Sequence, residues 1–124
     1  QLFPHLSTLD NVTFGPKLAG VSKNDRNDLG RTWLERVGLA GFGDRNVTEL
    51  SGGEAKRVAL ARTLAAQPTV VLLDEPLTGL DRELHDRLAV DLAELLAPIT
   101  TLLVTHDPDE AAVVADRIVA LADL

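Results

Sequence analysis

The sequence predicts an α/β fold in which helices flank a parallel sheet and a helical section precedes that sheet. Three short apolar runs, at residues 69–74, 101–105 and 117–121, have the length and composition of strands. Helical segments separate them, and the order strand, helix, strand, helix, strand is typical of parallel sheets with right-handed crossovers. The segment before Ser51 has helical character, so we expect a separate helical subdomain there.

The helical section contains two predicted helices. Ser7 or Thr8 can cap a short helix that extends to about Gly15, and a polar, turn-rich stretch follows at residues 20–28. A second helix is expected at about residues 25–37, because apolar side chains recur on one face. That face consists of Leu29, Trp33, Leu34 and Val37, and Gly38 stands where a helix-ending residue is needed.

Capping residues predict three further helices. Ser51 and Glu54 form an S-x-x-E capping box. Asp81 can cap the next helix, and Asp107 followed by Pro108 is typical of the start of another. The first two of these helices are expected at about residues 52–66 and 82–97, and the third from residue 108.

The strands themselves carry a burial signal. Residues 69–74 are almost continuously apolar, which is typical of a strand buried on both faces of a parallel sheet. Residues 101–105 are expected to form a second buried strand, and residues 117–121 a third strand.

Composition argues against several classes of protein. The chain has 124 residues, a formal net charge of −7 and no cysteine. The acidic excess argues against a surface that binds DNA or RNA. The lack of cysteine excludes disulfides and thiolate metal sites. No apolar run approaches the roughly 20 residues that span a bilayer.

The first of four notable constellations is residues 50–54. Gly52 and Gly53 let the backbone approach a ligand closely, and the helix that follows presents free N–H groups and a positive dipole end. The Ser51 hydroxyl can bond an anion or cap the helix. An ordinary capped helix start is therefore the alternative interpretation.

The second constellation is the carboxylate pair Asp74 and Glu75, at the expected carboxyl end of a strand. Parallel α/β sheets place ligands at that end. One carboxylate can hold Mg²⁺ through water, while the next orients and deprotonates an attacking water. The alternative is a strand followed by a solvated acidic turn.

The remaining two constellations are shorter. Gly79 permits a tight turn before Asp81, which taken alone is most simply a helix cap. His106 follows the second strand, where it can donate a hydrogen bond to a developing phosphate charge. A single loop histidine, taken alone, is more often uninvolved in chemistry.

Together these segments resemble the ABC-type ATPases. In order and spacing they are similar to the signature motif (50–54), the Walker B motif (70–75), the D-loop (77–81) and the switch histidine (His106). Residues 2–7 and 10–12 also resemble the segment after the Q-loop of importer subunits. The resemblance covers nearly the whole chain, which is identified as a member of that family.

The resemblance implies a fold and partners. The fold is a partial P-loop NTPase (RecA-like) core at residues 49–124, with the helical subdomain at residues 1–48. Two such subunits enclose two ATP molecules, so the implied partners are a second nucleotide-binding subunit, as a homodimer, and an integral-membrane permease. ATP and Mg²⁺ are the implied cofactors of the complete protein. The implied location is cytoplasmic, peripheral on the inner face of the cell membrane, with no nucleic acid bound.

The resemblance also implies residue roles. Glu75 would be the catalytic carboxylate that polarises water, His106 would contact the γ-phosphate, and Asp74 would help to hold Mg²⁺. Asp81 would link the two nucleotide sites of the dimer. The signature residues would contact the nucleotide on the partner; they are Ser51, Gly52, Gly53 and Glu54.

The chain departs from the family pattern in three respects. Glu54 stands where glutamine is commoner, and Thr78 and Gly79 replace a commoner Ser-Ala pair. No G-x-x-x-x-G-K-S/T motif occurs, and no lysine follows such a glycine loop. We therefore expect a fragment that does not hydrolyse ATP alone, and the absent initiator Met favours a piece of a longer product. Gln1 is expected to be a loop residue and not the Q-loop glutamine.

The missing segment has a structural consequence. In this family the P-loop strand lies between the strand that ends at His106 and the last strand of the chain. Without it, strand edges remain unpaired. We expect the chain to associate through those edges, to exchange elements or to rearrange.

The function that the sequence favours is the ATP-hydrolysing subunit of an ABC importer for a small solute or ion. One alternative is an ABC-family ATPase outside transport, although such proteins usually carry coiled-coil or zinc insertions and basic surfaces. Another is a non-catalytic interaction module that binds a full-length partner through residues 51–54.

Overall fold

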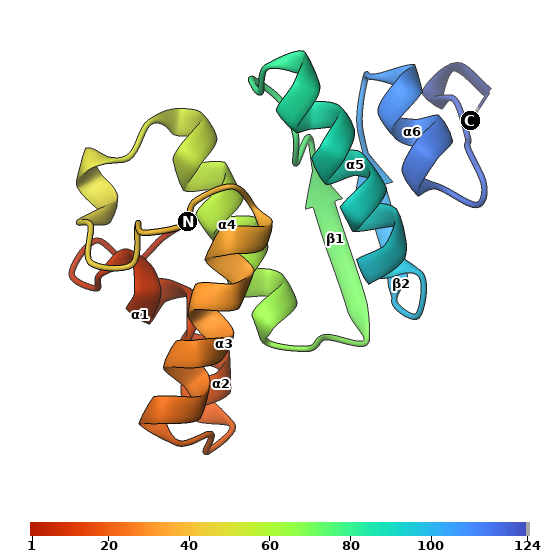
Figure 1. The fold of residues 1–124 in the computed structure, drawn as a ribbon. Coiled ribbons are helices and arrows are strands. Elements are labelled where there is room, and N and C mark those ends of the chain that lie inside the picture. The colour runs from red at the N-terminus through yellow and green to blue at the C-terminus, as the bar shows by residue number, and fades with distance from the viewer. Residues whose placement is uncertain (124) are drawn as a thin grey trace. The chain divides into compact units, whose positions relative to one another are not determined.

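The computed structural model describes residues 1–123, without the side chain of Asp123, and forms two compact units (Figure 1). The division between the units falls after Pro68. The predicted subdomain boundary between residues 48 and 49 concerns the subdomains of the family and stays a prediction.

The first unit is helical, as predicted. Its helices are α1 (Thr8–Val12), α2 (Phe14–Leu18), α3 (Lys23–Arg36), the 3-10 turn η1 (Val47–Glu49) and α4 (Gly52–Ala65). Ser7 caps α1, since its hydroxyl accepts a hydrogen bond from the amide of Asp10. The one short helix expected up to Gly15 is wrong in detail, because it is interrupted at Thr13.

Helix α3 begins earlier than the apolar pattern predicted. The hydroxyl of Ser22 accepts a hydrogen bond from the amide of Asp25 at 3.3 Å, and this cap starts the helix at Lys23. The turn-rich stretch expected up to residue 28 is therefore wrong beyond Ser22. At the other end, Gly38 has a φ of +78°, as the helix-ending position requires.

The core of the first unit is built on α1, α3 and α4, which contact one another. Of the predicted α3 face, Leu34 and Val37 are buried, while Leu29 and Trp33 are partly buried. The buried amide of Asn11 ties the N-terminal loop to this core. Its oxygen accepts from the amide of Phe3 at 2.8 Å, and its nitrogen donates to the carbonyl of Ser7 at 2.9 Å. These bonds satisfy a polar side chain that would otherwise be costly to bury.

The second unit contains the parallel sheet. In chain order it consists of β1 (Val70–Asp74), α5 (Arg82–Leu96), β2 (Thr100–Val104), α6 (Pro108–Val114) and the 3-10 turn η2 (Leu121–Asp123). β1 and β2 pair in parallel with Val70 opposite Thr100 and Asp74 opposite Val104. The predicted caps are confirmed, since Asp81 accepts from the amide of Leu84 and Asp107 from the amides of Asp109 and Glu110.

The predicted third strand is wrong. Residues 117–121 contain no strand, and the sheet of the described chain consists of β1 and β2 only. A strand needs a neighbour to pair its backbone groups. In the resemblance the neighbour of this segment is the P-loop strand, whose motif is absent from the sequence.

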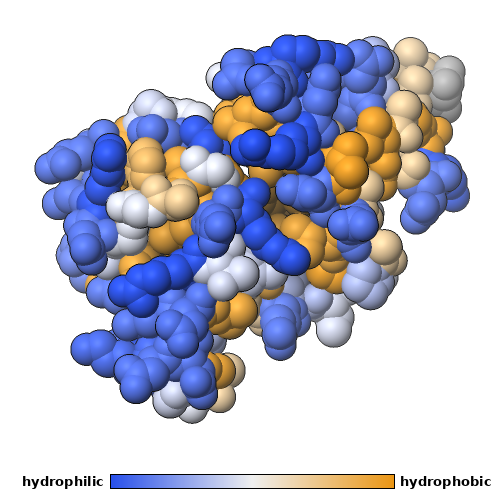
Figure 2. Space-filling view, viewed as in Figure 1, coloured by the Kyte–Doolittle hydropathy of each residue, from blue (hydrophilic) through white to orange (hydrophobic). Residues whose placement is uncertain are grey.

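The expectation that the strands are buried on both faces is also wrong. Burial alternates along β1, and the exposed side chains include Val70 and Leu72 on β1 and Leu102 and Val104 on β2. Apolar side chains accordingly remain visible on the surface in Figure 2. Among residues 1–123, no helix combines the length and apolar character needed to cross a membrane.

The close approach of α2 to the end of α4 generates a stability prediction. A Cβ built on Gly15 lies 2.8 Å from Cβ and 3.2 Å from Cα of Ala66. Overpacking costs about 1–3 kcal/mol, and the helix gains about 0.5–1 kcal/mol when alanine replaces glycine. We expect Gly15→Ala to lower the free energy of unfolding by about 1 kcal/mol. Urea unfolding measures this loss.

A double-mutant cycle provides the control. Because Ala66 supplies the contacting methyl group, Ala66→Gly in the Gly15→Ala background is expected to recover about 1 kcal/mol relative to additivity. Strictly additive losses would show that the two residues do not clash.

Candidate functional site

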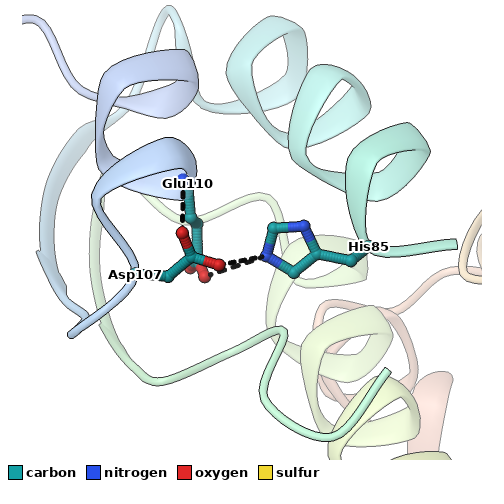
Figure 3. A group of neighbouring side chains, drawn as sticks. All are labelled: His85, Asp107 and Glu110. Carbon is teal, nitrogen blue, oxygen red and sulfur yellow. Dashed lines mark hydrogen bonds and ion pairs between the residues drawn. The ribbon is translucent and has the colours of Figure 1, made fainter. Parts of the chain in front are cut away.

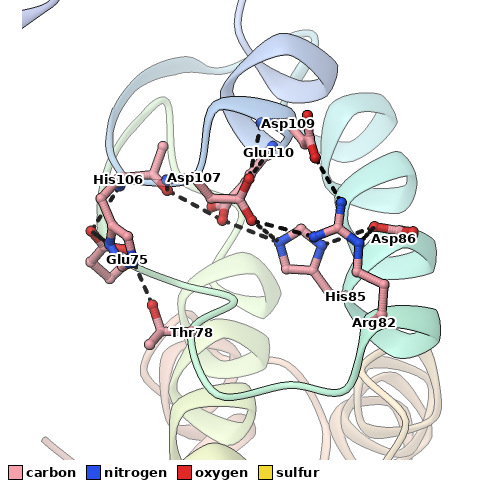
Figure 4. A network of polar contacts seen from close by, with 10 residues as sticks. Glu75, Thr78, Arg82, His85, Asp86, His106, Asp107, Asp109 and Glu110 are labelled. Atoms are coloured by element: carbon pink, nitrogen blue, oxygen red, sulfur yellow. Dashed lines mark hydrogen bonds and ion pairs between the residues drawn. The ribbon is translucent and has the colours of Figure 1, made fainter.

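Two of the predicted site residues meet at the carboxyl ends of the paired strands. The Glu75 carboxylate follows β1 and contacts the ring of His106, which follows β2 (Figure 4). Glu75 Oε1 lies 2.7 Å from Nδ1 of His106 and accepts from its backbone amide at 3.0 Å. Glu75 Oε2 accepts from the Thr78 hydroxyl at 3.1 Å. Both carboxylate oxygens are therefore held by neighbours.

The backbone fixes this contact as well. Glu75 has a φ of +49°, a left-handed conformation that is uncommon for a residue other than glycine. Its amide donates to the carbonyl of Val104 at 2.8 Å, which extends the β1–β2 pairing by one bond. Conformations of this kind cost energy and cluster at functional sites. The strain marks Glu75 as a residue whose placement matters.

The contact shifts both ionisations. The side-chain hydrogen bond from His106 is the largest of the causes that lower the pKa of Glu75, and the same bond to Glu75 raises the pKa of His106. Glu75 is therefore ionised at neutral pH, and the protonated form of His106 is favoured. The His106 side chain is 79% exposed and that of Glu75 26% exposed, so the imidazole can be reached from solvent.

The other predicted residues of the second unit lie close by in the chain. Asp74 ends β1 and is exposed. Thr78, Gly79 and His106 line, with Glu75, an open pocket of about 280 Å³. The carboxylate of Asp81 is occupied as the cap of α5, where it accepts from the amide of Leu84 at 3.0 Å.

The predicted signature residues lie at the start of α4 in the first unit. Ser51 Oγ accepts from the amide of Glu54 at 3.2 Å, and Glu54 Oε1 accepts from the amide of Ser51 at 2.9 Å. This backbone hydrogen bond from Ser51 is the largest cause that lowers the pKa of Glu54. A Cβ on Gly52 would meet nothing within 4 Å, so packing within the chain does not require a glycine there.

A further cluster that the sequence did not indicate lies between α5 and the start of α6. His85 projects from α5 toward Asp107 and Glu110 (Figure 3). His85 Nε2 lies 3.1 Å from Oδ2 of Asp107 and 3.5 Å from Oε2 of Glu110. His85 and Glu110 are buried. Residue spacing in the sequence could not predict this cluster, because the position of His85 within a helix does not indicate which residues of another element lie opposite.

Comparison with known families decides the identity of the fold. The family model described as ABC transporter matches residues 1–78, which is more than half of the chain. The chain belongs to the ABC transporter family. This match and the structural neighbours confirm the predicted family membership and the predicted α/β, P-loop NTPase fold.

Curated relatives of this ABC family chain are named as ATP-binding proteins for the import of Fe(3+) ions. The Fe(3+) ions import ATP-binding protein FbpC of Agrobacterium fabrum is 48% identical, and the alignment covers 98% of this chain and 35% of the relative. The protein of the same name from Streptomyces coelicolor is 47% identical, with 99% and 36% covered. The chain thus spans about a third of the length of these relatives.

Solved structures give the same family. The dimeric post-hydrolysis state of the ATP-binding cassette MJ0796, bound to ADP and Pi, aligns with a TM-score of 0.80 at 30% identity. The alignment covers 91% of this chain and 51% of that one. A second dimeric structure of MJ0796, titled a bacterial ABC transporter cassette, aligns with the same score.

The Glu75–His106 contact predicts a pH effect. Glu75 raises the pKa of His106, so this contribution to stability is complete below the ordinary histidine value and is lost as pH rises through the raised pKa. The lowered pKa of Glu75 makes its contribution present above the ordinary glutamate value and lost as pH falls. The pair therefore stabilises the fold most at mildly acidic pH, between the ordinary pKa of glutamate and the ordinary pKa of histidine.

Glu75→Gln tests this directly. We expect the pKa of His106, followed by NMR of its ring protons in the presence of EDTA, to fall when Glu75 loses its charge. His5 supplies an internal control, because its signal should not move with this substitution. An unchanged His106 titration would contradict the contact.

The capping box at the start of α4 predicts different losses of stability for substitutions of Ser51 and Glu54. Ser51→Ala removes the acceptor for the amide of Glu54, and we expect it to cost about 1 kcal/mol of unfolding free energy. Glu54→Gln retains a side-chain acceptor for the amide of Ser51 and should change stability by less than about 0.5 kcal/mol. Thermal unfolding of both variants checks the difference. Equal losses would show that the reciprocal box is not the source of stability.

Proposed function

We propose that the chain is a portion of the ATP-binding and ATP-hydrolysing subunit of an ABC importer. In this proposal residues 1–48 form the helical subdomain that meets an integral-membrane permease. Residues 49–124 form part of the catalytic core, and the subunit acts as a homodimer on the inner face of the cell membrane. The contact between Glu75 and His106 carries the proposal.

That contact brings together a base and a phosphate-sensing group. The ionised Glu75 carboxylate is suited to orient a water and take its proton, and His106 is suited to donate a hydrogen bond to a phosphate oxygen. The 2.7 Å distance between Glu75 Oε1 and His106 Nδ1 places the two functions side by side. Both stand at the carboxyl ends of parallel strands, where α/β sheets bind ligands.

The hydrogen bonds of this contact also define a resting arrangement of the Glu75 carboxylate. Glu75 Oε1 accepts from His106 and Oε2 accepts from Thr78, so the base is engaged with the protein's own donors. If His106 donates to a γ-phosphate instead, Oε1 becomes available to a water. A gain of reactivity on nucleotide binding follows from this exchange of one hydrogen bond.

The proposed metal ligand fits this edge. Asp74 is an exposed carboxylate at the end of β1, and oxygen ligands of this kind suit Mg²⁺, which usually keeps several waters and one or two carboxylates. The ion would neutralise charge on the phosphates. Asp74 would hold it, while Glu75 would remain the proton acceptor.

The signature residues are proposed to act on the nucleotide of the partner subunit. The start of α4 supplies free N–H groups and the positive end of a 14-residue helix. Gly52 adds no side chain that could block the approach of a phosphate, and Ser51 is proposed to present its hydroxyl there. Because the Ser51 hydroxyl already accepts from the amide of Glu54, its own hydrogen remains for an anion. Asp81 is proposed to link the two sites across the dimer.

The substrate class is proposed from the relatives. Proteins at 44–48% identity are named as Fe(3+) import ATP-binding proteins. We infer that the complete transporter takes up a small solute or ion, with iron(III) the first candidate to test. The 124-residue sequence has no Walker A motif, so it is not expected to hydrolyse ATP by itself.

The test is hydrolysis by the protein at the length its host produces. We expect Glu75→Gln to reduce kcat by about 10²–10⁴-fold, because it removes a general base. Nucleotide binding should persist. Glu94→Gln, an exposed carboxamide substitution on α5 away from this edge, is the matched control. Hydrolysis that survives Glu75→Gln would remove Glu75 from the proposed role.

A further inference from the structure

We propose that His85, Asp107 and Glu110 form a binding site for a divalent transition-metal ion, in the same pocket as Glu75 and His106 but with ligands other than those of the proposed magnesium and nucleotide site. Each residue offers one ligand atom, and all three atoms lie within 4.8 Å of one another. The site joins α5 to the start of α6 and does not depend on the proposed ATPase activity.

The hydrogen-bonding pattern leaves one ring nitrogen of His85 and one oxygen of Glu110 open to a ligand, while the other Glu110 oxygen, Oε2, accepts from the Thr105 hydroxyl at 3.3 Å. His85 Nε2 and Glu110 Oε1 are buried and make no hydrogen bond within the described part of the chain. The approach of Nε2 to Asp107 Oδ2, at 3.1 Å, has the distance of an ion pair without the geometry of a hydrogen bond. Asp107 Oδ1, in contrast, is occupied by the amides of Asp109 and Glu110. Buried polar atoms without partners point to a group that completes them.

Asp86 orients the imidazole of His85 from the side of the ring that faces away from Asp107 and Glu110. His85 Nδ1 lies 3.1 Å from Oδ1 of Asp86 (Figure 4). The Asp86 carboxylate can only accept a hydrogen bond when it is ionised, so it holds the Nδ1 side of the ring, while Nε2 on the opposite side faces Asp107 and Glu110. A carboxylate behind the imidazole is the usual support of a metal-binding histidine.

The charges around the cluster call for a cation. Glu110 is only 2% exposed, and its buried carboxylate faces that of Asp107. Arg82 lies 3.9 Å from Asp107 Oδ2, but it makes its closest ion pair with Asp109, at 2.7 Å. The centre of the cluster thus contains two carboxyl groups that face one imidazole nitrogen.

The distances suit a first-row metal ion. Ligand atoms about 2.0–2.2 Å from a tetrahedral Zn²⁺ lie about 3.3–3.6 Å apart. His85 Nε2 stands 3.1 Å from Asp107 Oδ2 and 3.5 Å from Glu110 Oε2. One imidazole and two carboxylates leave a fourth position for water. All three residues also line the pocket of about 280 Å³, which supplies a route from solvent.

The experiment is a calorimetric titration of the metal-free protein, at the length its host produces, with Zn²⁺. We expect one ion per chain and a rise in the unfolding temperature with zinc. Glu110→Gln keeps the shape of the side chain and should weaken zinc binding by more than about 100-fold, as should His85→Asn. Asp86→Ala, which removes only the support of the imidazole, should weaken it by about 10–100-fold.

Two controls decide between sites. His5→Asn should leave zinc binding unchanged. His106→Asn removes the exposed imidazole beside Glu75. Loss of binding in that variant, with retention in His85→Asn and Glu110→Gln, would place the ion at Glu75 and overturn the proposal. A folded protein that binds no zinc at millimolar concentration would also overturn the proposal. Bound Co²⁺ should show a visible spectrum that Glu110→Gln abolishes.

Discussion

The parallel pairing of β1 with β2 determines where Asp74, Glu75 and His106 lie. With Asp74 opposite Val104, the residues that follow each strand emerge at one edge, and the amide of Glu75 continues the pairing by bonding the carbonyl of Val104. Glu75 and His106, 31 residues apart in sequence, consequently meet at hydrogen-bond distance. The left-handed backbone of Glu75 is part of the same arrangement, since it turns the chain while the amide stays in register.

Local chemistry explains what the sequence could predict. The helix starts at Ser51, Asp81 and Asp107 follow from side chains that bond amides two or three residues ahead, so four or five residues contain the whole signal. The contact between Glu75 and His106 was not predicted, although each residue was expected at the carboxyl end of a strand, where parallel α/β sheets place ligands. Identical reasoning brought Asp74 to that end.

Non-local partners explain what the sequence could not predict. Residues 117–121 have the composition of a strand but no strand beside them, and β1 is apolar on a face that the described residues leave exposed. A propensity describes what a segment can do with a neighbour and carries no information on whether that neighbour is present. His85 is the opposite case, because its position on α5 gives no sign that Asp107 and Glu110 lie opposite.

The loop between β2 and α6 serves both clusters. His106 turns to Glu75, and the next residue, Asp107, turns to His85 while its other oxygen caps α6. The proposed movement of His106 from Glu75 to a phosphate would have to be absorbed by this short segment. An ion held by Asp107 would hold one end of that segment. Such an ion changes hydrolysis only if it binds the two positions of the loop with different affinity, and by reciprocity nucleotide would then change the affinity for the ion by the same factor.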